Sequence, residues 1–269
     1  MPELPEVETC RRGIEPHIVG KRITAITVRQ PKLRWPIPED FTERFTDAII
    51  HTVTRRSKYL LLHTDVGTVL VHLGMSGVLR VVRTDTPLKK HDHVDIQFAG
   101  GTCLRYHDPR RFGYMLYSEN DQHPLLAKLA PEPLGKAFTA DYLIEKLTGK
   151  TVPIKTAIMN SQWVVGVGNI YANESLFLAG LSPTRPAGSL SPDEVAALVK
   201  AIRTILNRAI TQGGTTLKDF TQADGKPGYF TQQLNVYGRG NQPCLQCGTL
   251  LKQTKLAGRQ TVHCPSCQP

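Results

Sequence analysis

The chain has 269 residues, enough for two modest domains or one large one. Hydrophobic residues make up 40% of it and charged residues 21%, and no apolar run approaches the length of a membrane span. The 33 Lys and Arg exceed the 23 Asp and Glu, and this net charge of +10 favours a polyanionic partner, with nucleic acid first and an anionic membrane second. Because no basic segment followed by an apolar one begins the chain, we expect no signal peptide, a cytoplasmic location and no disulfides.

Residues 1–131 predict one helix followed by many short strands. The helix runs from Pro5 to Ile18, with an acidic first turn and Gly20 as its stop. The pair Gly100-Gly101 between two alternating segments indicates a hairpin. Short strands at this spacing favour a sandwich or barrel over a parallel sheet. The predicted strand segments are 22–30, 59–74, 78–83 and 93–107.

After a Pro-rich break at 130–135 the apolar residues recur every three or four positions, as in helices. Ser191 and Glu194 form a capping box around Pro192, and the helix that follows is expected to stop at Gly213-Gly214. Further helices are expected at 141–147, 154–160 and 169–181. We therefore predict an α+β protein with three domains, at 1–131, 132–232 and 233–269.

Four of the six cysteines lie in the last 26 residues, as the pairs Cys244/Cys247 and Cys264/Cys267. Two CxxC turns joined by a segment with hairpin alternation fit a tetrahedral four-thiolate zinc site, while a redox or disulfide role is the alternative. Because four thiolates leave no open position, the zinc is expected to be structural. The joining segment carries three cations, which either contact phosphate or form a solvated face: Lys252, Lys255 and Arg259.

The segment VVGVGNIYANES (164–175) is a glycine-rich entry into a predicted helix. Gly166 and Gly168 allow a close backbone approach, and Asn169 is expected to cap the helix. Helix amides that point outwards favour a phosphate site. A tight interhelical turn explains the same pattern about as well.

Two polar segments of the strand region are ambiguous. In HDPRRFG (107–113), a guanidinium and the ring of Phe112 could fill a gap left by a displaced base, although an Arg-Arg pair is more often a salt-bridged surface. In KHDHVD (90–95), His91 and His93 alternate with two aspartates. We do not expect a metal there, since cysteines are available elsewhere.

The chain begins Met-Pro-Glu, and a small second residue such as Pro2 normally allows Met1 to be removed. The exposed α-amino group has a reference pKa of about 7.7–8, so a useful fraction is neutral near pH 7. A neutral secondary amine can attack an electrophilic carbon such as a sugar C1′ and then form an iminium ion. Glu3 could supply a proton to the departing group or the sugar. An N-terminal proline base, as in a tautomerase, is the rival use.

Taken together, these segments closely resemble bacterial formamidopyrimidine-DNA glycosylases, which are bifunctional glycosylases and abasic-site lyases for oxidised purines. The matching segments run in one order across nearly the whole chain. The start PELPEVE is similar to this branch rather than to endonuclease VIII, which prefers oxidised pyrimidines. The segments that carry the resemblance are MPELPEVE, SKYLLLH, HLGMSG, HDPRRFG, VVGVGNIYANESLF, GGTTLKDF, DGKPGYF, VYGR and the four-cysteine finger.

The resemblance implies an N-terminal β-sandwich with an N-terminal helix, a helix–two-turn–helix domain and a C-terminal zinc-finger β-hairpin. It implies that Pro2 is the nucleophile and Glu3 the proton donor. Lys58 would bind phosphate and donate a proton in β-elimination, and Arg259 would bind phosphate and assist δ-elimination. The implied DNA contacts are His91, Arg110 and Asn169, with Met75, Arg110 and Phe112 as the wedge that fills the helix.

The resemblance also implies that residues 221–229 form a loop over the flipped base. The implied partner is double-stranded DNA with oxidised purines or abasic sites, bound by a monomer in the bacterial cytoplasm and nucleoid. One structural Zn²⁺ is implied, with no redox or organic cofactor. Members often carry several lysines just before the IK of the segment IKTAIM, where this chain reads GKTVPIK, and neither Lys150 nor Lys155 is assigned a contact. The competing interpretations are a non-enzymatic zinc-finger DNA-binding protein and a pyrimidine-selective relative.

Overall fold

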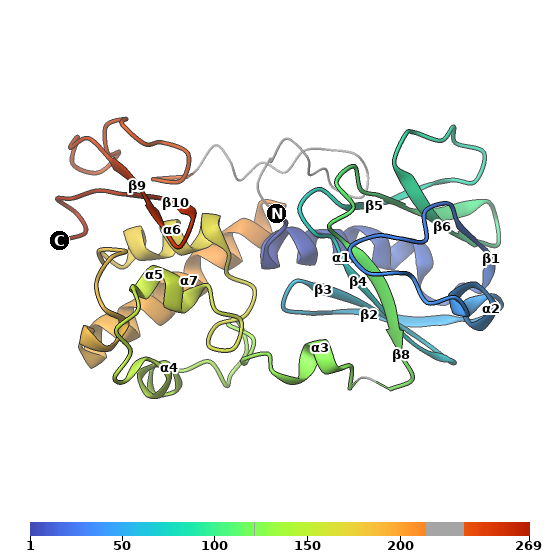
Figure 1. Ribbon diagram of the computed structural model, residues 1–269, viewed down its shortest axis with the longest axis horizontal. Coiled ribbons are helices and arrows are strands. Elements are labelled where there is room, and N and C mark those ends of the chain that lie inside the picture. Colours follow the sequence, from blue (N-terminus) through green and yellow to red (C-terminus); the bar gives the residue numbers. More distant parts are fainter. Residues whose placement is uncertain (121, 214–233) are drawn as a thin grey trace. The chain divides into compact units, whose positions relative to one another are not determined.

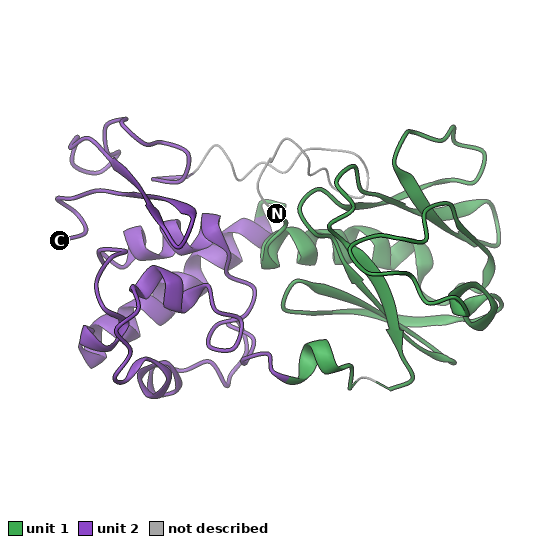
Figure 2. Cartoon of the chain, viewed as in Figure 1, with its two compact units in different colours: residues 1–127, 212–229 green, residues 128–211, 230–269 purple. Residues whose placement is uncertain are grey.

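The computed structural model describes residues 1–120, 122–213 and 234–269 and divides the chain into two compact units (Figure 2). One unit comprises residues 1–127 with 212–229, and the other comprises 128–211 with 230–269. The predicted loop at 221–229 lies outside the described residues. Among the helices of the described residues, none has both the length and the apolar character needed to cross a bilayer.

The first unit has an N-terminal helix followed by antiparallel strands. Its strands form two four-stranded sheets, in the orders β1-β6-β7-β5 and β2-β3-β4-β8 (Figure 1). The predicted β-sandwich with an N-terminal helix is thereby confirmed, although β2 and β8 are not among the strands predicted from the sequence. The elements are α1 (Leu4–Ile18), β1 (Ile23–Val28), α2 (Phe41–Phe45), β2 (Ile50–Arg56), β3 (Tyr59–Thr64), β4 (Gly67–His72), β5 (Val78–Arg83), β6 (Asp92–Phe98), β7 (Thr102–His107), β8 (Tyr114–Ser118) and α3 (Pro124–Ala127).

One apolar core joins α1 to both sheets. The helix contributes Val7 and Ile14, while Leu60 of β3 and Ile96 of β6 come from different sheets. Strands β2 and β3 of one sheet and β5 and β7 of the other contact α1. Burial of these side chains is the main favourable contribution to the fold, at about 1.5–3 kcal/mol for each fully buried aliphatic residue. The helix that follows Pro2 and Glu3 is thus fixed by the sandwich core.

Local sequence explains where α1 begins and how β6 turns into β7. Glu3 is the N-cap of α1 and forms a capping box with Glu6, and Pro5 lies in the first turn, where its missing N–H is not needed. After the helix, Gly20 has a φ of 77°, which glycine adopts readily. Gly100 and Gly101 have φ values of 81° and 77°, so the predicted hairpin turn is present.

The second unit contains the predicted helical region and the C-terminal hairpin. α6 contacts α5, α7 and β10, so it connects the helices with the hairpin (Figure 1). The predicted capping box of α7 is present, since the Glu194 N–H donates to Ser191 Oγ at 3.2 Å and the Ser191 N–H donates to Glu194 Oε2 at 2.8 Å. The elements are α4 (Ala140–Leu147), α5 (Ile154–Ile158), α6 (Asn169–Leu178), a 3₁₀ turn (Ala187–Ser189), α7 (Pro192–Thr211), β9 (Lys252–Leu256) and β10 (Arg259–His263).

Candidate active site and nucleic-acid interface

Pro2 and Glu3 lie directly ahead of the first turn of α1. Both residues are buried, and Glu3 is only 3% exposed. The backbone N–H of Glu3 donates to Glu6 Oε2 at 2.8 Å, and Glu6 is itself fully buried. This bond fixes the path of the chain as it enters the helix. A carboxyl group therefore lies one residue from the nitrogen of Pro2, at a position largely shielded from water.

Lys58 lies in the turn between β2 and β3, and an arginine ties this turn to α1. Ser57 in the turn has a φ of 56°, and its carbonyl accepts a hydrogen bond from the Arg55 guanidinium at 2.8 Å. The same guanidinium contacts the Glu8 carboxylate of α1 at 3.3 Å. Lys58 lies in a turn between two strands, and Pro2 precedes a helix. Both are nevertheless attached to α1.

His72, at the end of β4, is a candidate site residue that the sequence analysis missed. Burial lowers its pKa to about 4, and the charges of Lys58 and Arg34 act in the same direction. Its Nδ1 accepts the N–H of Gly74 at 3.0 Å, so the neutral ring carries its hydrogen on Nε2. The ring also stacks on Tyr114, with centres 4.9 Å apart. A neutral imidazole beside two cations can donate a hydrogen bond to an anion without adding charge.

The structure brings together the two loops that carry Met75, Arg110 and Phe112. The Arg110 guanidinium lies 4.8 Å from the centre of the Phe112 ring, and Phe112 is 44% exposed. The loops approach so closely that a Cβ added to Gly74 would collide with the backbone of Gly113. Since Met75 directly follows this contact, the three proposed wedge residues lie on one adjoining pair of loops.

Asp108 is a fully buried acceptor that organises both of these loops. Its Oδ1 accepts the hydroxyl of Ser76 at 2.8 Å, and its Oδ2 accepts the N–H of Gly113 at 2.9 Å. The hydroxyl of Tyr106 also donates to Oδ2, at 3.1 Å, and the N–H of Arg110 donates to Oδ1 at 3.3 Å. This aspartate belongs to the segment HDPRRFG, and no role was predicted for it. An aspartate ahead of a Pro-containing turn is nevertheless a recognisable turn signal.

His91 lies just before β6, has a φ of 79° and is half-buried. Its ring centre lies 6.0 Å from that of His93 and 6.2 Å from that of His107. His93 is hydrogen-bonded through Nε2 to the carbonyl of Asp108 at 2.8 Å, and His107 through Nδ1 to Asp92 at 2.8 Å. The single group of described residues that could hold a metal ion is the cysteine quartet, not these histidines.

Asn169 is the first residue of α6, and the N-cap is Gly168, which corrects the expectation that Asn169 is the cap. Gly166, with a φ of 78°, makes the turn that precedes the helix. The Asn169 Oδ1 is buried, and no hydrogen bond from a described residue reaches it. The side-chain amide lies at the positive end of the helix, and its NH2 group can donate hydrogen bonds to an anion.

Farther along α6, Glu174 binds the chain that leads into the zinc hairpin. Its fully buried carboxylate accepts the backbone N–H of Val236 at 2.8 Å and that of Tyr237 at 2.9 Å. Both the backbone and the side-chain amide of Asn235 also donate to it, at 2.9 and 3.0 Å. Four donors satisfy the buried charge, so the helix that begins at Asn169 also fixes the entry to the hairpin.

Lys155 is buried and supports the hairpin strand that begins at Arg259. Its Nζ donates to the Gln260 carbonyl at 2.8 Å and to Thr261 Oγ1 at 2.7 Å. Arg259 itself is exposed, directly after the hairpin turn. Lys150, the other lysine left unassigned, is exposed, and its Nζ lies 5.5 Å from the centre of the Trp163 ring.

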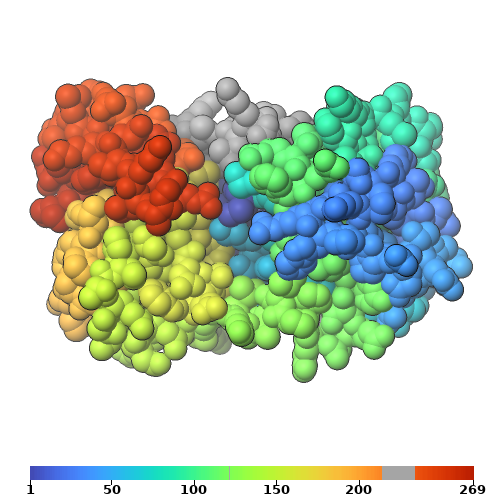
Figure 3. Space-filling view, viewed as in Figure 1, coloured from blue at the N-terminus to red at the C-terminus, as the bar shows by residue number. Residues whose placement is uncertain are grey.

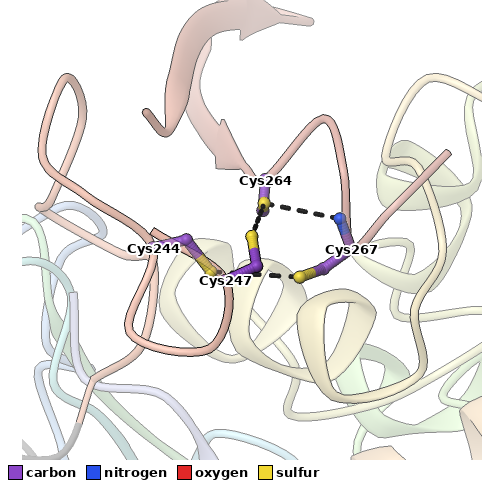
Figure 4. A group of neighbouring side chains, drawn as sticks. All are labelled: Cys244, Cys247, Cys264 and Cys267. Carbon is purple, nitrogen blue, oxygen red and sulfur yellow. Dashed lines mark hydrogen bonds between the residues drawn. The ribbon is translucent and has the colours of Figure 1, made fainter. Parts of the chain in front are cut away.

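The four cysteines of the C-terminal hairpin converge on one point (Figure 4). Their sulfur atoms all lie within 4.8 Å of one another, with 3.5 Å between Cys247 and Cys264 and 4.0 Å between Cys244 and Cys267. A tetrahedral zinc with Zn–S bonds of about 2.3 Å requires sulfur atoms roughly 3.8 Å apart, so the donor set and its spacing fit a structural Zn²⁺. In each CxxC turn a backbone N–H points to a cysteine sulfur at 3.4 Å, which favours the thiolate form.

Three family models match successive parts of the chain. The formamidopyrimidine-DNA glycosylase N-terminal domain matches residues 1–115 and the formamidopyrimidine-DNA glycosylase H2TH domain matches 129–221. The zinc finger found in FPG and IleRS matches residues 241–269.

Full-length relatives and solved structures are similar to the whole chain. Formamidopyrimidine-DNA glycosylases of Thioalkalivibrio sulfidiphilus and Photobacterium profundum are 57% and 56% identical to it, with all of each chain covered. The crystal structure of MutM (Fpg) from Thermus thermophilus has a TM-score of 0.90 at 38% identity, over 99% of this chain and 98% of that one. A complex of Lactococcus lactis Fpg with abasic-site DNA has a TM-score of 0.92 at 36% identity, over 99% of both chains.

Proposed function

The chain belongs to the formamidopyrimidine-DNA glycosylase family, and on this basis we propose that it excises oxidised purines from duplex DNA and then cleaves the abasic strand. The proposed substrates are 8-oxoguanine, formamidopyrimidines and abasic sites. A Lactococcus lactis relative whose structure is similar to this chain was solved with DNA containing Fapy-dG. The observation that carries the proposal is the buried Pro2–Glu3 pair ahead of α1, since a purely DNA-binding protein has no use for it.

In the proposed excision step, the nitrogen of Pro2 attacks C1′ of the lesion nucleotide after Met1 has been removed. The N–C1′ bond forms as the bond from C1′ to the base breaks, and the electron pair of that bond leaves with the base. The ammonium proton is then lost, and the C1′–O4′ bond opens to give an iminium ion. Glu3 supplies a proton to the departing base or to the sugar oxygen. Its position next to Pro2 supports this role.

In the proposed lyase steps, the iminium ion makes the C2′ proton acidic. Removal of that proton breaks the 3′ C–O bond, and a second elimination breaks the 5′ C–O bond, so that a one-nucleotide gap remains. Lys58 binds phosphate and donates a proton during the first elimination. Arg259 binds phosphate and assists the second. The attachment of the Lys58 turn to α1 through Arg55 and Glu8 supports its place beside Pro2.

The remaining proposed residues hold the DNA. A base within the stack cannot be reached, so the nucleotide is flipped out, and Met75, Arg110 and Phe112 fill the gap it leaves. Asn169 binds a phosphate at the start of α6, and His91 is a further DNA contact. The shared loop contacts of the three wedge residues and the position of Asn169 at the N-terminus of α6 support these roles.

The four cysteines hold one structural Zn²⁺, which supplies folding energy to the hairpin that carries Arg259. We propose that the protein acts as a monomer, without a redox or organic cofactor, in the bacterial cytoplasm at the nucleoid. We also propose domain limits at 1–131, 132–232 and 233–269.

The proposed function is tested with a duplex that carries one 8-oxoguanine opposite cytosine, incubated in the presence of borohydride. We expect a covalent adduct trapped on the protein with borohydride and a nick in a parallel reaction without it. The control is a chain with an uncleaved N-terminal extension, in which the nitrogen of Pro2 is a tertiary amide whose lone pair is delocalised. This control should bind the duplex but form no adduct and no nick. If it cleaves and cross-links as fast as the native chain, the nucleophile lies elsewhere, for example at a lysine.

A further inference from the structure

A strongly basic pocket shares Arg110 and Phe112 with the proposed wedge, and its other cations have no role in the function described so far. Its volume is about 680 Å³. The two segments that form it are joined by a backbone hydrogen bond, and Figure 3 shows blue and green atoms side by side at the surface of the first unit. The lining residues are Lys32, Leu33, Arg34, Arg110, Arg111 and Phe112.

The lining of this pocket fits an anion. Among the described residues, its lining contains four cations, Lys32, Arg34, Arg110 and Arg111, and no carboxylate. In the described part of the chain, none of the four forms a salt bridge; the bridges formed by neighbouring arginines involve Arg29, Arg80 and Arg105 instead. Like charges so close together repel each other, and a bound anion removes that repulsion. Guanidinium groups also match the fork geometry of phosphate oxygens.

The pocket is built by contacts that fix both of its walls. The N–H of Arg34 donates to the carbonyl of Gly113 at 3.1 Å. The Trp35 ring stacks on that of Tyr114, with centres 4.8 Å apart and planes 26° from parallel. The chain at Arg34 and Trp35 is therefore attached to Gly113 and Tyr114, which directly follow Phe112.

Arg111 adds an independent observation, because it adopts an uncommon backbone conformation. Its φ is 54°, in the left-handed region that residues with a Cβ rarely occupy, and its N–H donates to the Asp108 carbonyl at 3.2 Å. Such a conformation persists only where the surroundings impose it, and it is concentrated at functional sites. In this loop it allows Arg110, Arg111 and Phe112 to line the same pocket.

We propose that this pocket binds a backbone phosphate of the DNA strand opposite the lesion. The proposal rests on the proposed function, in which Lys58, Asn169 and Arg259 hold phosphates of the damaged strand. Arg110 and Phe112 belong both to the wedge and to the pocket wall, so the pocket begins where the wedge enters the duplex. The grooves of B-DNA are roughly 6 and 12 Å wide, which brings the far strand within reach of side chains at the base of such a wedge.

The test uses two variants that each remove one pocket cation, Arg111→Gly and Lys32→Ala. Glycine is the residue best suited to the φ of 54° at position 111, so Arg111→Gly removes the guanidinium without straining the loop. The control is Arg83→Ala, which removes an exposed cation from the same unit outside the pocket. Melting temperatures within a few degrees of the wild type are expected for all three proteins.

Binding is measured on a lesion duplex containing a stable abasic-site analogue and on the same damaged strand alone. Each pocket variant should bind the duplex about tenfold more weakly, as expected for one charge-assisted phosphate contact. Its slope of log K against log salt should fall by about 0.9. Binding of the single strand should match that of Arg83→Ala. Equal losses on duplex and single strand would assign the pocket to the damaged strand and overturn the proposal.

The phosphate itself is located by replacing single phosphates of the undamaged strand with neutral methylphosphonates. We expect one position at which the wild type loses about tenfold in affinity and Arg111→Gly loses nothing further. No such position on that strand would also overturn the proposal. The failure of the two proposals can be told apart. A wild type that neither binds nor nicks lesion DNA contradicts the proposed function, whereas an active wild type with pocket variants equal to Arg83→Ala contradicts this inference alone.

Discussion

Three fully buried carboxylates, those of Glu6, Asp108 and Glu174, hold the segments that carry the candidate site residues. Each accepts at least one backbone N–H, from the chain start, from the wedge loop and from the hairpin entry respectively. A hydrogen bond to a charged group contributes about 1.5–3 kcal/mol, and leaving such a buried group unsatisfied costs more. The positions of the residues proposed to touch DNA therefore depend on these three carboxylates, which are not themselves proposed to touch it.

Arg259, in contrast to these buried carboxylates, is exposed and is proposed to contact DNA itself. It is not a zinc ligand. Arg259→Ala should weaken binding to lesion DNA, reduce the slope of log K against log salt by about 0.9, and leave the zinc content unchanged. The matched control is Lys200→Ala, which removes an exposed cation from α7 of the same unit. Binding titrations at several salt concentrations measure the slope. A slope and strand cleavage equal to those of Lys200→Ala would show that Arg259 is a solvated surface residue.

At the scale of elements, the β9–β10 hairpin depends on its metal more than any other part of the described chain. The hairpin shares a small buried cluster with Phe177 of α6, to which Val236, Leu251 and Val262 contribute together with two cysteines. Such a cluster buries too little apolar surface to offset the entropy of ordering the segment, so a metal must supply the difference. Hydrogen bonds from Lys155 and to Glu174 attach the hairpin to the helices but do not form its interior.

Cys247→Ser should therefore lose the zinc and most of the DNA binding, while the sandwich and the helices stay folded. Removing one thiolate leaves an incomplete donor set, and apparent zinc-binding energies of structural sites are about 10–16 kcal/mol. Elemental analysis gives the zinc content, and circular dichroism reports the remaining fold. Ser266→Ala, an exposed change beside the ligand Cys267, is the control. Stoichiometric zinc and undiminished affinity for damaged DNA in Cys247→Ser would refute this prediction.

At the scale of the whole molecule, resistance to acid should depend on buried ion pairs of the sandwich unit. Arg105 donates to both carboxylate oxygens of Asp95, at 2.8 and 2.9 Å, and Arg29 also contacts Asp95 at 2.7 Å. Burial alone would raise the pKa of Asp95, but the hydrogen bonds from Arg105 and Arg29 outweigh it and hold that pKa below its ordinary value of 3.8. The stabilisation is complete above the unfolded pKa and is lost as the pH falls through the lower folded pKa.

Asp95→Asn should lower the free energy of unfolding at neutral pH by about 3–5 kcal/mol, because two arginines lose their buried partner. It should also flatten the decline in stability below about pH 4, since the titrating group is gone. Asp85→Asn, which removes a carboxylate that is 69% exposed and paired with Arg83, should change stability by less than about 1 kcal/mol. In a Trp163→Phe background, Trp35 is the remaining tryptophan, and its fluorescence during urea unfolding reports on this unit. Equal pH profiles for Asp95→Asn and the parent protein would contradict the prediction.

The features that the sequence predicted correctly are those set by residues close together in the chain. The α7 capping box, the Gly100-Gly101 turn and the zinc-ligand spacing each depend on a few neighbouring residues, so their geometry follows from local stereochemistry. Strand β2 was missed because its alternation is broken by a register shift after Ile50 and its buried residues, Ile50 and Val53, lie three positions apart. The cap of α6 was misplaced by one residue because a glycine, as well as an asparagine, can occupy that position.

Only the tertiary structure shows which polar residues are buried and hydrogen-bonded to other segments of the chain. Nothing in the neighbourhood of Lys155 distinguishes a phosphate ligand from a lysine that donates to Gln260 and Thr261, more than 100 positions away. The same holds for His72, whose pKa is lowered to about 4 by burial first, and then by Lys58 and Arg34 from other parts of the chain. Whether a polar side chain meets water or a buried partner depends on contacts between distant segments, because desolvation acts through space and not along the sequence. The sequence by itself determined most of the elements and the zinc ligands, and the packing of the sandwich and of α6 decided the surroundings in which the remaining residues lie.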